Sequence, residues 1–106
     1  MKKIYLFCSA GMSTSMLASK MQDVANEHKL PIKVAAFPHG QIGEIIETDR
    51  PDCILLGPQV NYLYDETVKN HGDKNIPIAV IDQADYGMMN GEKVLKKAIK
   101  MIKANK

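Results

Sequence analysis

The sequence predicts an α/β protein built on a four-stranded parallel sheet with helices on both faces. Short apolar runs alternate along the chain with segments whose apolar residues recur at helical spacing. The first run, Ile4 to Phe7, is apolar throughout, as expected for a strand that is covered on both sides. A chain of 106 residues is one domain that can bury a core, so we expect residues 1–106 to fold as a unit.

The predicted strands are the four apolar runs at 4–7, 32–37, 53–56 and 78–81. Right-handed crossovers should connect them, and we expect the flavodoxin-like strand order 2-1-3-4. In that order the first and third strands are neighbours. All four carboxyl ends then lie at one edge of the sheet, which is where open α/β sheets bind ligands.

Helices are predicted between and after these strands. The first should run from about Ser13 to His28, and a short one should contain residues 42–46. A third should cover about 60–70, and an amphipathic helix should follow Asn90, whose side chain can cap it. Met12 and Met16, at the start of the first helix, can shield the loop, but methionines at such positions are more often core filler.

A loop of small and hydroxyl-bearing residues follows the first strand and begins with a cysteine, Cys8-Ser9-Ala10-Gly11-Met12-Ser13-Thr14-Ser15. Backbone N–H groups in such a loop, followed by a helix N-terminus, form an anion site. A cysteine inside an anion site indicates a thiolate that attacks or carries a phosphoryl group. The alternative is a buried cysteine at the end of a strand, followed by an ordinary turn.

The spacing in this loop bears on the choice between transfer and hydrolysis. Cysteine-dependent tyrosine phosphatases resemble the layout, and their arginine would stand at Thr14. Without a guanidinium the loop lacks the bidentate group that stabilises the transition state of hydrolysis. We therefore expect a phosphocysteine that persists and is passed on. There are two alternatives. One is a low-molecular-weight phosphatase, and the other is a phosphate- or nucleotide-binding domain in which Cys8 is passive.

The segment 4–15 resembles the active loop of the IIB component of the bacterial phosphoenolpyruvate-dependent sugar phosphotransferase system (PTS). The resemblance is to the lactose/cellobiose type, cellobiose/chitobiose branch, and extends to 36–38, 55–60 and 86–87. It implies a cytoplasmic protein-cysteine phosphotransferase. Cys8 would accept phosphoryl from a phosphohistidine of a IIA protein. It would donate it to a sugar, such as cellobiose or chitobiose, held by a membrane IIC protein.

In this scheme Cys8 is the nucleophile, and no general base is needed if its thiol is already ionised. The loop after the third strand should face Cys8 and offers the neutral amide of Gln59. The residues predicted to hold the phosphoryl group are Ser9, Ala10, Gly11, Met12, Ser13, Thr14, Ser15 and Gln59.

We expect no metal and no cofactor, since donor and acceptor bring no polyphosphate and two cysteines without clustered histidines make a poor zinc site. Cys53 stands at the start of a strand and is predicted to be a core thiol. His39, Asp82 and Asp85 follow other strands at the functional edge, and their roles stay open. His39 is a turn residue that can steer an anion, and either aspartate is a candidate general acid or a turn residue.

Composition excludes several other classes of function. A formal charge of +2 without a basic block does not favour nucleic acid. The apolar stretches are far short of a membrane span, so direct insertion is not expected. The N-terminus, Met1-Lys2-Lys3, enters a strand at once and shows no signal-peptide pattern, which favours the cytoplasm.

Overall fold

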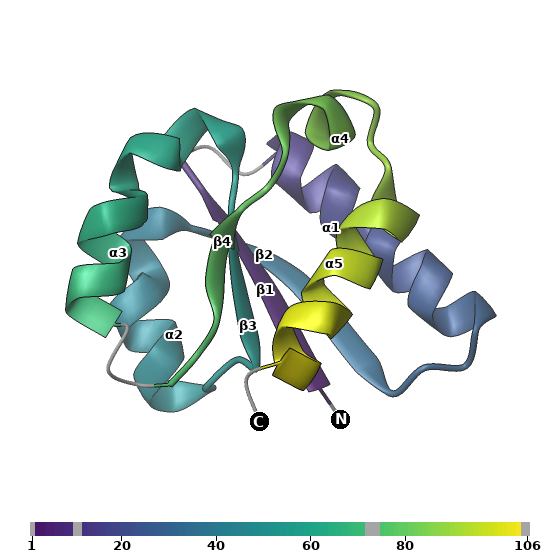
Figure 1. Ribbon diagram of the computed structural model, residues 1–106, viewed down its shortest axis with the longest axis horizontal. Coiled ribbons are helices and arrows are strands. Elements are labelled where there is room, and N and C mark those ends of the chain that lie inside the picture. Colours follow the sequence, from purple (N-terminus) through teal and green to yellow (C-terminus); the bar gives the residue numbers. More distant parts are fainter. Residues whose placement is uncertain (1, 10–11, 72–74, 105–106) are drawn as a thin grey trace.

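The computed structural model describes residues 2–9, 12–71 and 75–104. Its four strands form one parallel sheet in the order β2-β1-β3-β4, which confirms the predicted flavodoxin-like arrangement (Figure 1). The strands are β1 (Lys2–Cys8), β2 (Ile32–Pro38), β3 (Cys53–Leu56) and β4 (Ile78–Val80). In the register Phe7 pairs with Leu56, so Cys8 and Gly57 follow at the same level of the sheet.

Helices cover both faces of the sheet (Figure 1). One face carries α1 (Met12–Glu27) and α5 (Gly91–Ala104), with the short α4 (Gln83–Gly87) at the carboxyl edge. The other face carries α2 (Ile42–Thr48) and α3 (Tyr64–His71). Two 3-10 segments, η1 (His39–Gln41) and η2 (Pro58–Leu63), follow β2 and β3. None of the helices in the described ranges is long and apolar enough to cross a membrane.

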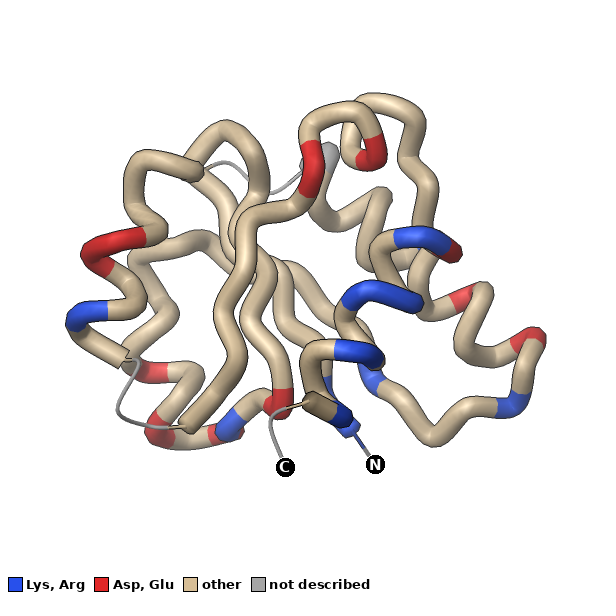
Figure 2. Tube along the Cα trace, viewed as in Figure 1, with Lys and Arg blue, Asp and Glu red and all other residues tan. Residues whose placement is uncertain are grey.

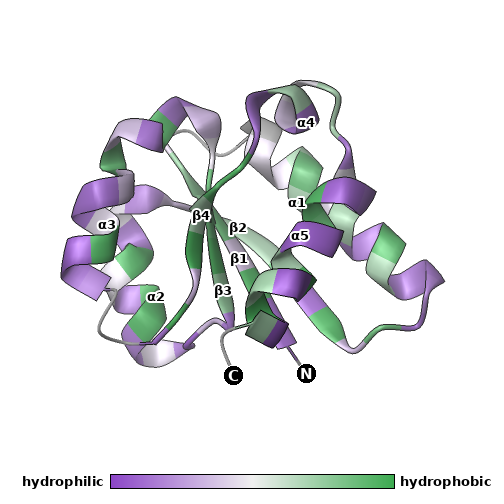
Figure 3. Cartoon of the chain, in the orientation of Figure 1, coloured by the Kyte–Doolittle hydropathy of each residue, from purple (hydrophilic) through white to green (hydrophobic). Residues whose placement is uncertain are grey.

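The core has two halves because successive side chains of β1 point to opposite faces of the sheet. Ile4 and Leu6 join the cluster under α1 and α5, whereas Tyr5 and Phe7 join the cluster under α2 and α3. The apolar colouring of the strands in Figure 3 reflects this double coverage. Burying one such side chain contributes about 1.5–3 kcal/mol, which explains why the buried part of β1, residues 4–8, contains no charged side chain.

The segment after β3 does not start as the predicted α-helix. Pro58 opens a 3-10 turn, Val60 has non-helical dihedral angles (φ −116°, ψ 25°), and the α-helix begins only at Tyr64. Val60 is fully buried in the core, so tertiary packing overrides the helical pattern that begins at this residue.

Two further features of the helices differ from expectation. The sequence did not predict α4, which begins because the carboxylate of Asp82 accepts hydrogen bonds from the N–H groups of Ala84 (2.9 Å) and Asp85 (3.3 Å). Met16 is 57% exposed and is not core filler, because Leu17 provides the buried side chain of this turn. The predicted cap of α5 is confirmed: Asn90 Oδ1 accepts from the N–H of Lys93 at 3.1 Å.

Candidate active site

The ends of β1 and β3 bring Cys8 against the loop that begins at Gly57. The N–H of Gly57 donates to the carbonyl of Phe7 at 2.8 Å, which continues the pairing of the two strands. A Cβ on Gly57 would lie 3.3 Å from the Cβ of Cys8. The loop after β3 therefore faces Cys8, as the predicted strand order required. Cys8 is 1% exposed, at the point where the strand passes into the helical segment.

A cluster of three polar side chains lies beside Cys8, and we call Thr14, Gln59 and Tyr86 the hydroxyl–amide cluster. The amide nitrogen of Gln59 donates to the phenol oxygen of Tyr86 at 2.8 Å. The same phenol lies 3.2 Å from Oγ1 of Thr14. These residues come from η2, α4 and α1, so the cluster ties three elements together at the carboxyl edge of the sheet.

The cluster packs against Gly57 on the side where Cys8 lies. From the position that a Cβ of Gly57 would take, Oε1 of Gln59 is 2.6 Å away and Oγ1 of Thr14 is 3.6 Å away. Thr14 is fully buried, whereas Gln59 is exposed. The absence of a side chain at Gly57 thus leaves room next to the cysteine for the carbonyl oxygen of Gln59, which is an acceptor, and for the hydroxyl of Thr14.

The remaining predicted loop residues lie between β1 and the first turn of α1. Ala10 and Gly11 are outside the described residues. Ser9 is an exposed bend residue and Ser15 an exposed residue of α1, while Met12 and Ser13 begin that helix. The 16-residue helix α1 begins at Met12, shortly after Cys8, and the first N–H groups of a helix have no partner within the helix. The assignment of Ser9 through Ser15 to phosphoryl binding stays a prediction.

The described segments 12–19, 57–64 and 81–91 contain no lysine, arginine or histidine, whereas His39 follows Pro38, which pairs with Cys8. Figure 2 shows acidic positions at α4, and neither acidic nor basic positions along η2. A phosphoryl group bound here would therefore be held by amide and hydroxyl donors rather than by a guanidinium or an ammonium group.

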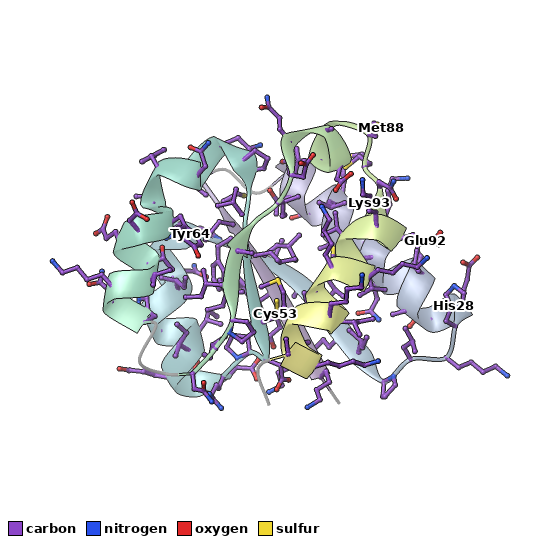
Figure 4. The ribbon with its side chains drawn as sticks, in the orientation of Figure 1. His28, Cys53, Tyr64, Met88, Glu92 and Lys93 are labelled. Atoms are coloured by element: carbon purple, nitrogen blue, oxygen red, sulfur yellow. The ribbon has the colours of Figure 1, made fainter. Side chains whose placement is uncertain are left out.

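Asp82 and Asp85 both hold α4 in place. Hydrogen bonds from the backbone N–H groups of Asp85 and Ala84 keep the pKa of Asp82 below its usual range. The buried carboxylate of Asp85 forms ion pairs with Lys93 (3.4 Å) and Lys97 (3.3 Å) of α5, and Figure 4 shows Lys93 beneath α4. These contacts position the helix that carries Tyr86.

His39 lies at the carboxyl edge but belongs to the opposite helix layer. Its Nε2 is 3.0 Å from Oγ1 of Thr67, which is buried on α3. Burial lowers the pKa of His39 from its ordinary value. The imidazole thus contacts α3 rather than the hydroxyl–amide cluster.

Cys53 is fully buried, as predicted for a core thiol. Figure 4 shows its side chain in the interior, among the strands. Burial raises the pKa of this thiol to about 12, so it stays protonated near neutral pH. In the part of the chain that the structure describes, no three His, Cys, Asp or Glu side chains are grouped as metal ligands.

The family model described as "PTS system, Lactose/Cellobiose specific IIB subunit" matches residues 3–97. The chain belongs to this IIB family. It is therefore a component of the sugar phosphotransferase system, as the resemblance of its cysteine loop indicated.

IIB components of several specificities resemble the chain over nearly its full length. It is 42% identical to a galactose-specific EIIB component of Lactococcus lactis subsp. cremoris, covering 92% of this chain and 93% of that protein. A cellobiose-specific EIIB component of Lactococcus lactis subsp. lactis is 41% identical, with the same coverage. An oligo-beta-mannoside-specific EIIB component of Bacillus subtilis is 36% identical over 96% of this chain and 97% of that one.

Solved structures agree with the fold. A cellobiose-specific phosphotransferase IIB component from Borrelia burgdorferi superposes with a TM-score of 0.81 at 36% identity, covering 98% of this chain and 94% of that one. A lactose-specific EIICB component of Streptococcus mutans contains a segment that is 32% identical to this chain. The match covers 78% of this chain and 14% of the EIICB component. A segment similar to this IIB chain thus occurs within a longer PTS component.

Sequence reasoning assigned no role to Tyr86, although the structure brings it between Thr14 and Gln59. Its position in the segment after the fourth strand placed it at the functional edge of the sheet. That topological signal was present in the sequence. The position of α4, however, determines which side chain of the segment reaches Thr14.

Proposed function

We propose that Cys8 of this IIB chain is the phosphoryl carrier, and that residues 1–106 act as one protein-cysteine phosphotransferase domain. The supporting observation is the position of Cys8 at the end of β1, beside the hydroxyl–amide cluster and before the N-terminus of α1. The site offers neutral donors for a bound dianion, and the described segments around it contain no guanidinium.

In the first step the Cys8 thiolate attacks the phosphorus of a phosphohistidine on a IIA protein. The sulfur–phosphorus bond forms, the nitrogen–phosphorus bond breaks, and the electron pair of that bond returns to the imidazole, which takes up a proton. In the second step a hydroxyl of a sugar bound by membrane IIC attacks the same phosphorus. The hydroxyl proton is released to solvent and the thiolate leaves, which regenerates the carrier.

A phosphocysteine must survive between these two steps. Amide and hydroxyl donors stabilise the bound dianion, whereas hydrolysis requires stabilisation of the equatorial oxygens in the transition state. Thr14 is buried and neutral at the position where a phosphatase has its arginine. The arrangement therefore favours transfer over hydrolysis, and the transfer takes place in the cytoplasm, where the sugar phosphate is released.

The acceptor that we propose is a β-disaccharide such as cellobiose or chitobiose. A cellobiose-specific IIB component is among the similar proteins, and it shares 41% of its aligned residues with this chain. The sugar itself is bound by IIC, so the IIB chain determines the chemistry of transfer rather than the choice of sugar.

Incubation with phosphorylated IIA protein tests the carrier role. Mass spectrometry should find one phosphoryl group on Cys8, and the phosphoprotein should then phosphorylate a sugar in membranes that contain IIC. Cys8→Ser should remove the modification while the circular dichroism spectrum is retained, because a serine hydroxyl does not ionise near neutral pH. Cys53→Ser is the matched control and should still accept phosphoryl. Labelling of the Cys8→Ser variant would refute the assignment, rapid release of free phosphate would favour a phosphatase, and no modification would favour simple binding.

A further inference from the structure

The phenol of Tyr86 contacts two polar side chains of the candidate site, those of Gln59 and Thr14. It lies 2.8 Å from Nε2 of Gln59 and 3.2 Å from Oγ1 of Thr14. Gln59 is exposed at the mouth of the site, whereas Thr14 is fully buried next to the space left by Gly57. The phenol is therefore the link between the rim of the site and its interior.

The hydrogen bonds of this link have a direction. A carboxamide nitrogen only donates, so the phenol oxygen of Tyr86 accepts from Gln59. Either hydroxyl can donate across the 3.2 Å between the phenol and Oγ1 of Thr14, and we assign the phenol as the donor because its oxygen already accepts from Gln59. The hydroxyl proton of Thr14 is thereby left for another acceptor. Hydrogen bonds in such a chain polarise and strengthen one another.

The helix that carries Tyr86 is held from two sides. Asp82 caps its first turn, and the buried carboxylate of Asp85 is paired with Lys93 and Lys97 of α5. A side chain orients a partner well only when its own position is supported by packing and hydrogen bonds. Tyr86 follows Asp85 directly, so the ion pairs support the phenol at its place between Thr14 and Gln59.

We propose that Tyr86 is a positioning residue, whose hydroxyl orients the Thr14 hydroxyl so that it donates to the phosphoryl group on Cys8. The inference rests on the proposed carrier role of Cys8 and adds the residue that orders the donors. In this arrangement a chain of neutral groups occupies the place where a phosphatase has a guanidinium. It stabilises the dianion of the phosphocysteine without adding a positive charge.

The titration of the phosphocysteine between its monoanion and dianion reports on these donors. A hydrogen-bond donor to the dianion lowers the pH at the midpoint of this titration. Phosphorus NMR measures that midpoint on the purified phosphoprotein without a partner. Tyr86→Phe removes the hydroxyl and keeps the ring, and we expect its midpoint to rise by about 0.5 to 1 pH unit. Tyr62→Phe is the matched control, because Tyr62 is 73% exposed on η2, and its midpoint should equal that of the wild type.

A double-mutant cycle separates positioning from a general structural effect. If Tyr86 acts through the Thr14 hydroxyl, Tyr86→Phe should have no further effect in the Thr14→Val background. Thr14→Ser keeps a hydroxyl and should restore the sensitivity to Tyr86→Phe. An equal rise in both backgrounds would overturn the inference, as would a Tyr86→Phe midpoint equal to that of the wild type.

A second variant tests the direction of the hydrogen bonds from Gln59 through Tyr86 to Thr14 without changing the phenol. Gln59→Glu replaces the donor by an acceptor, so the phenol proton turns toward residue 59 and the phenol accepts from Thr14 instead. The midpoint should then rise more in the Thr14 wild-type background than in the Thr14→Val background, where only the added charge acts. Equal rises would overturn the proposed direction. If wild-type protein gains no phosphoryl group on Cys8, the carrier role fails instead.

Discussion

Gly57 and Cys8 lie so close that a Cβ on Gly57 would be 3.3 Å from the Cβ of Cys8. The same Cβ would be only 2.6 Å from Oε1 of Gln59. Gly57 has φ −62° and ψ 152°, dihedral angles that alanine adopts without strain. The absence of a side chain at this position is therefore a matter of space in the site rather than of backbone conformation.

Gly57→Ala should reduce phosphoryl transfer while leaving the stability of the fold nearly unchanged. The added methyl group displaces the flexible end of Gln59, which costs little because this side chain is exposed, and it requires a small shift of the Cβ of Cys8. We expect the free energy of unfolding to change by less than about 1 kcal/mol. Phosphoryl acceptance from IIA should fall, because Gln59 no longer reaches Tyr86. Denaturant unfolding and a transfer assay measure the two effects, with Gly40→Ala as the control, since a Cβ there meets nothing within 4 Å. Wild-type transfer by Gly57→Ala would contradict this reading of the site.

Cys53→Ser should destabilise the protein without affecting transfer. Cys53 is fully buried, and a hydroxyl left unpaired in its place costs about 1–3 kcal/mol. Burial raises the pKa of the native thiol to about 12, so it takes no part in chemistry near neutral pH. Denaturant unfolding measures the loss, and Cys53→Ala separates the unpaired hydroxyl from the lost volume. Impaired phosphoryl acceptance by a folded Cys53→Ser protein would contradict the assignment of this cysteine to the core.

Gly91→Ala should destabilise the contact between α1 and α5. A Cβ on Gly91 would lie 2.9 Å from the carbonyl carbon of Lys20 and 2.9 Å from the backbone nitrogen of Met21. Since these are backbone atoms, the two helices must move apart, at a cost of about 1–3 kcal/mol. Thermal or denaturant unfolding detects this change. Gly87→Ala is the control, because its Cβ would meet nothing within 4 Å, and equal stability of the two variants would show that the helices adjust freely.

Protonation of His39 should weaken the fold as the pH falls. Burial, the largest cause, lowers the pKa of His39 below its ordinary value of 6.5, so the folded state favours the neutral imidazole. The unfolded chain then binds the proton more readily. The stabilisation is therefore complete above about pH 6.5 and is lost as the pH falls through the folded pKa.

Unfolding curves between pH 7.5 and pH 5 measure this dependence. His39→Gln should flatten the loss of stability over that range, since it removes the titrating group at the contact with Thr67. His28→Gln is the control, because His28 is exposed at the end of α1, where Figure 4 labels it. A His39→Gln variant with the slope of the wild type would assign the pH dependence to other groups.

Some local predictions failed where packing competes with periodicity. The segment after β3 has apolar residues at helical spacing, yet burial of Val60 keeps its first turns in 3-10 geometry. The helix α4 has only five residues and no apolar periodicity to reveal it, so it depends on its Asp82 cap. Met16 is apolar but lies on the exposed side of α1, since one helix turn buries only part of its circumference.

The sequence by itself determined the parallel sheet, its strand order and the place of Cys8 at the end of the first strand. These features follow from apolar runs, helical spacing and loop composition, which are local properties of the chain. Only the tertiary structure decided which side chains meet there. Thr14 and Tyr86 are 72 residues apart in the sequence, and their contact depends on how α4 rests on α5 through the ion pairs of Asp85. Such contacts are set by the packing of distant elements, because one edge of a sheet presents many polar residues and only the helix positions select those that touch.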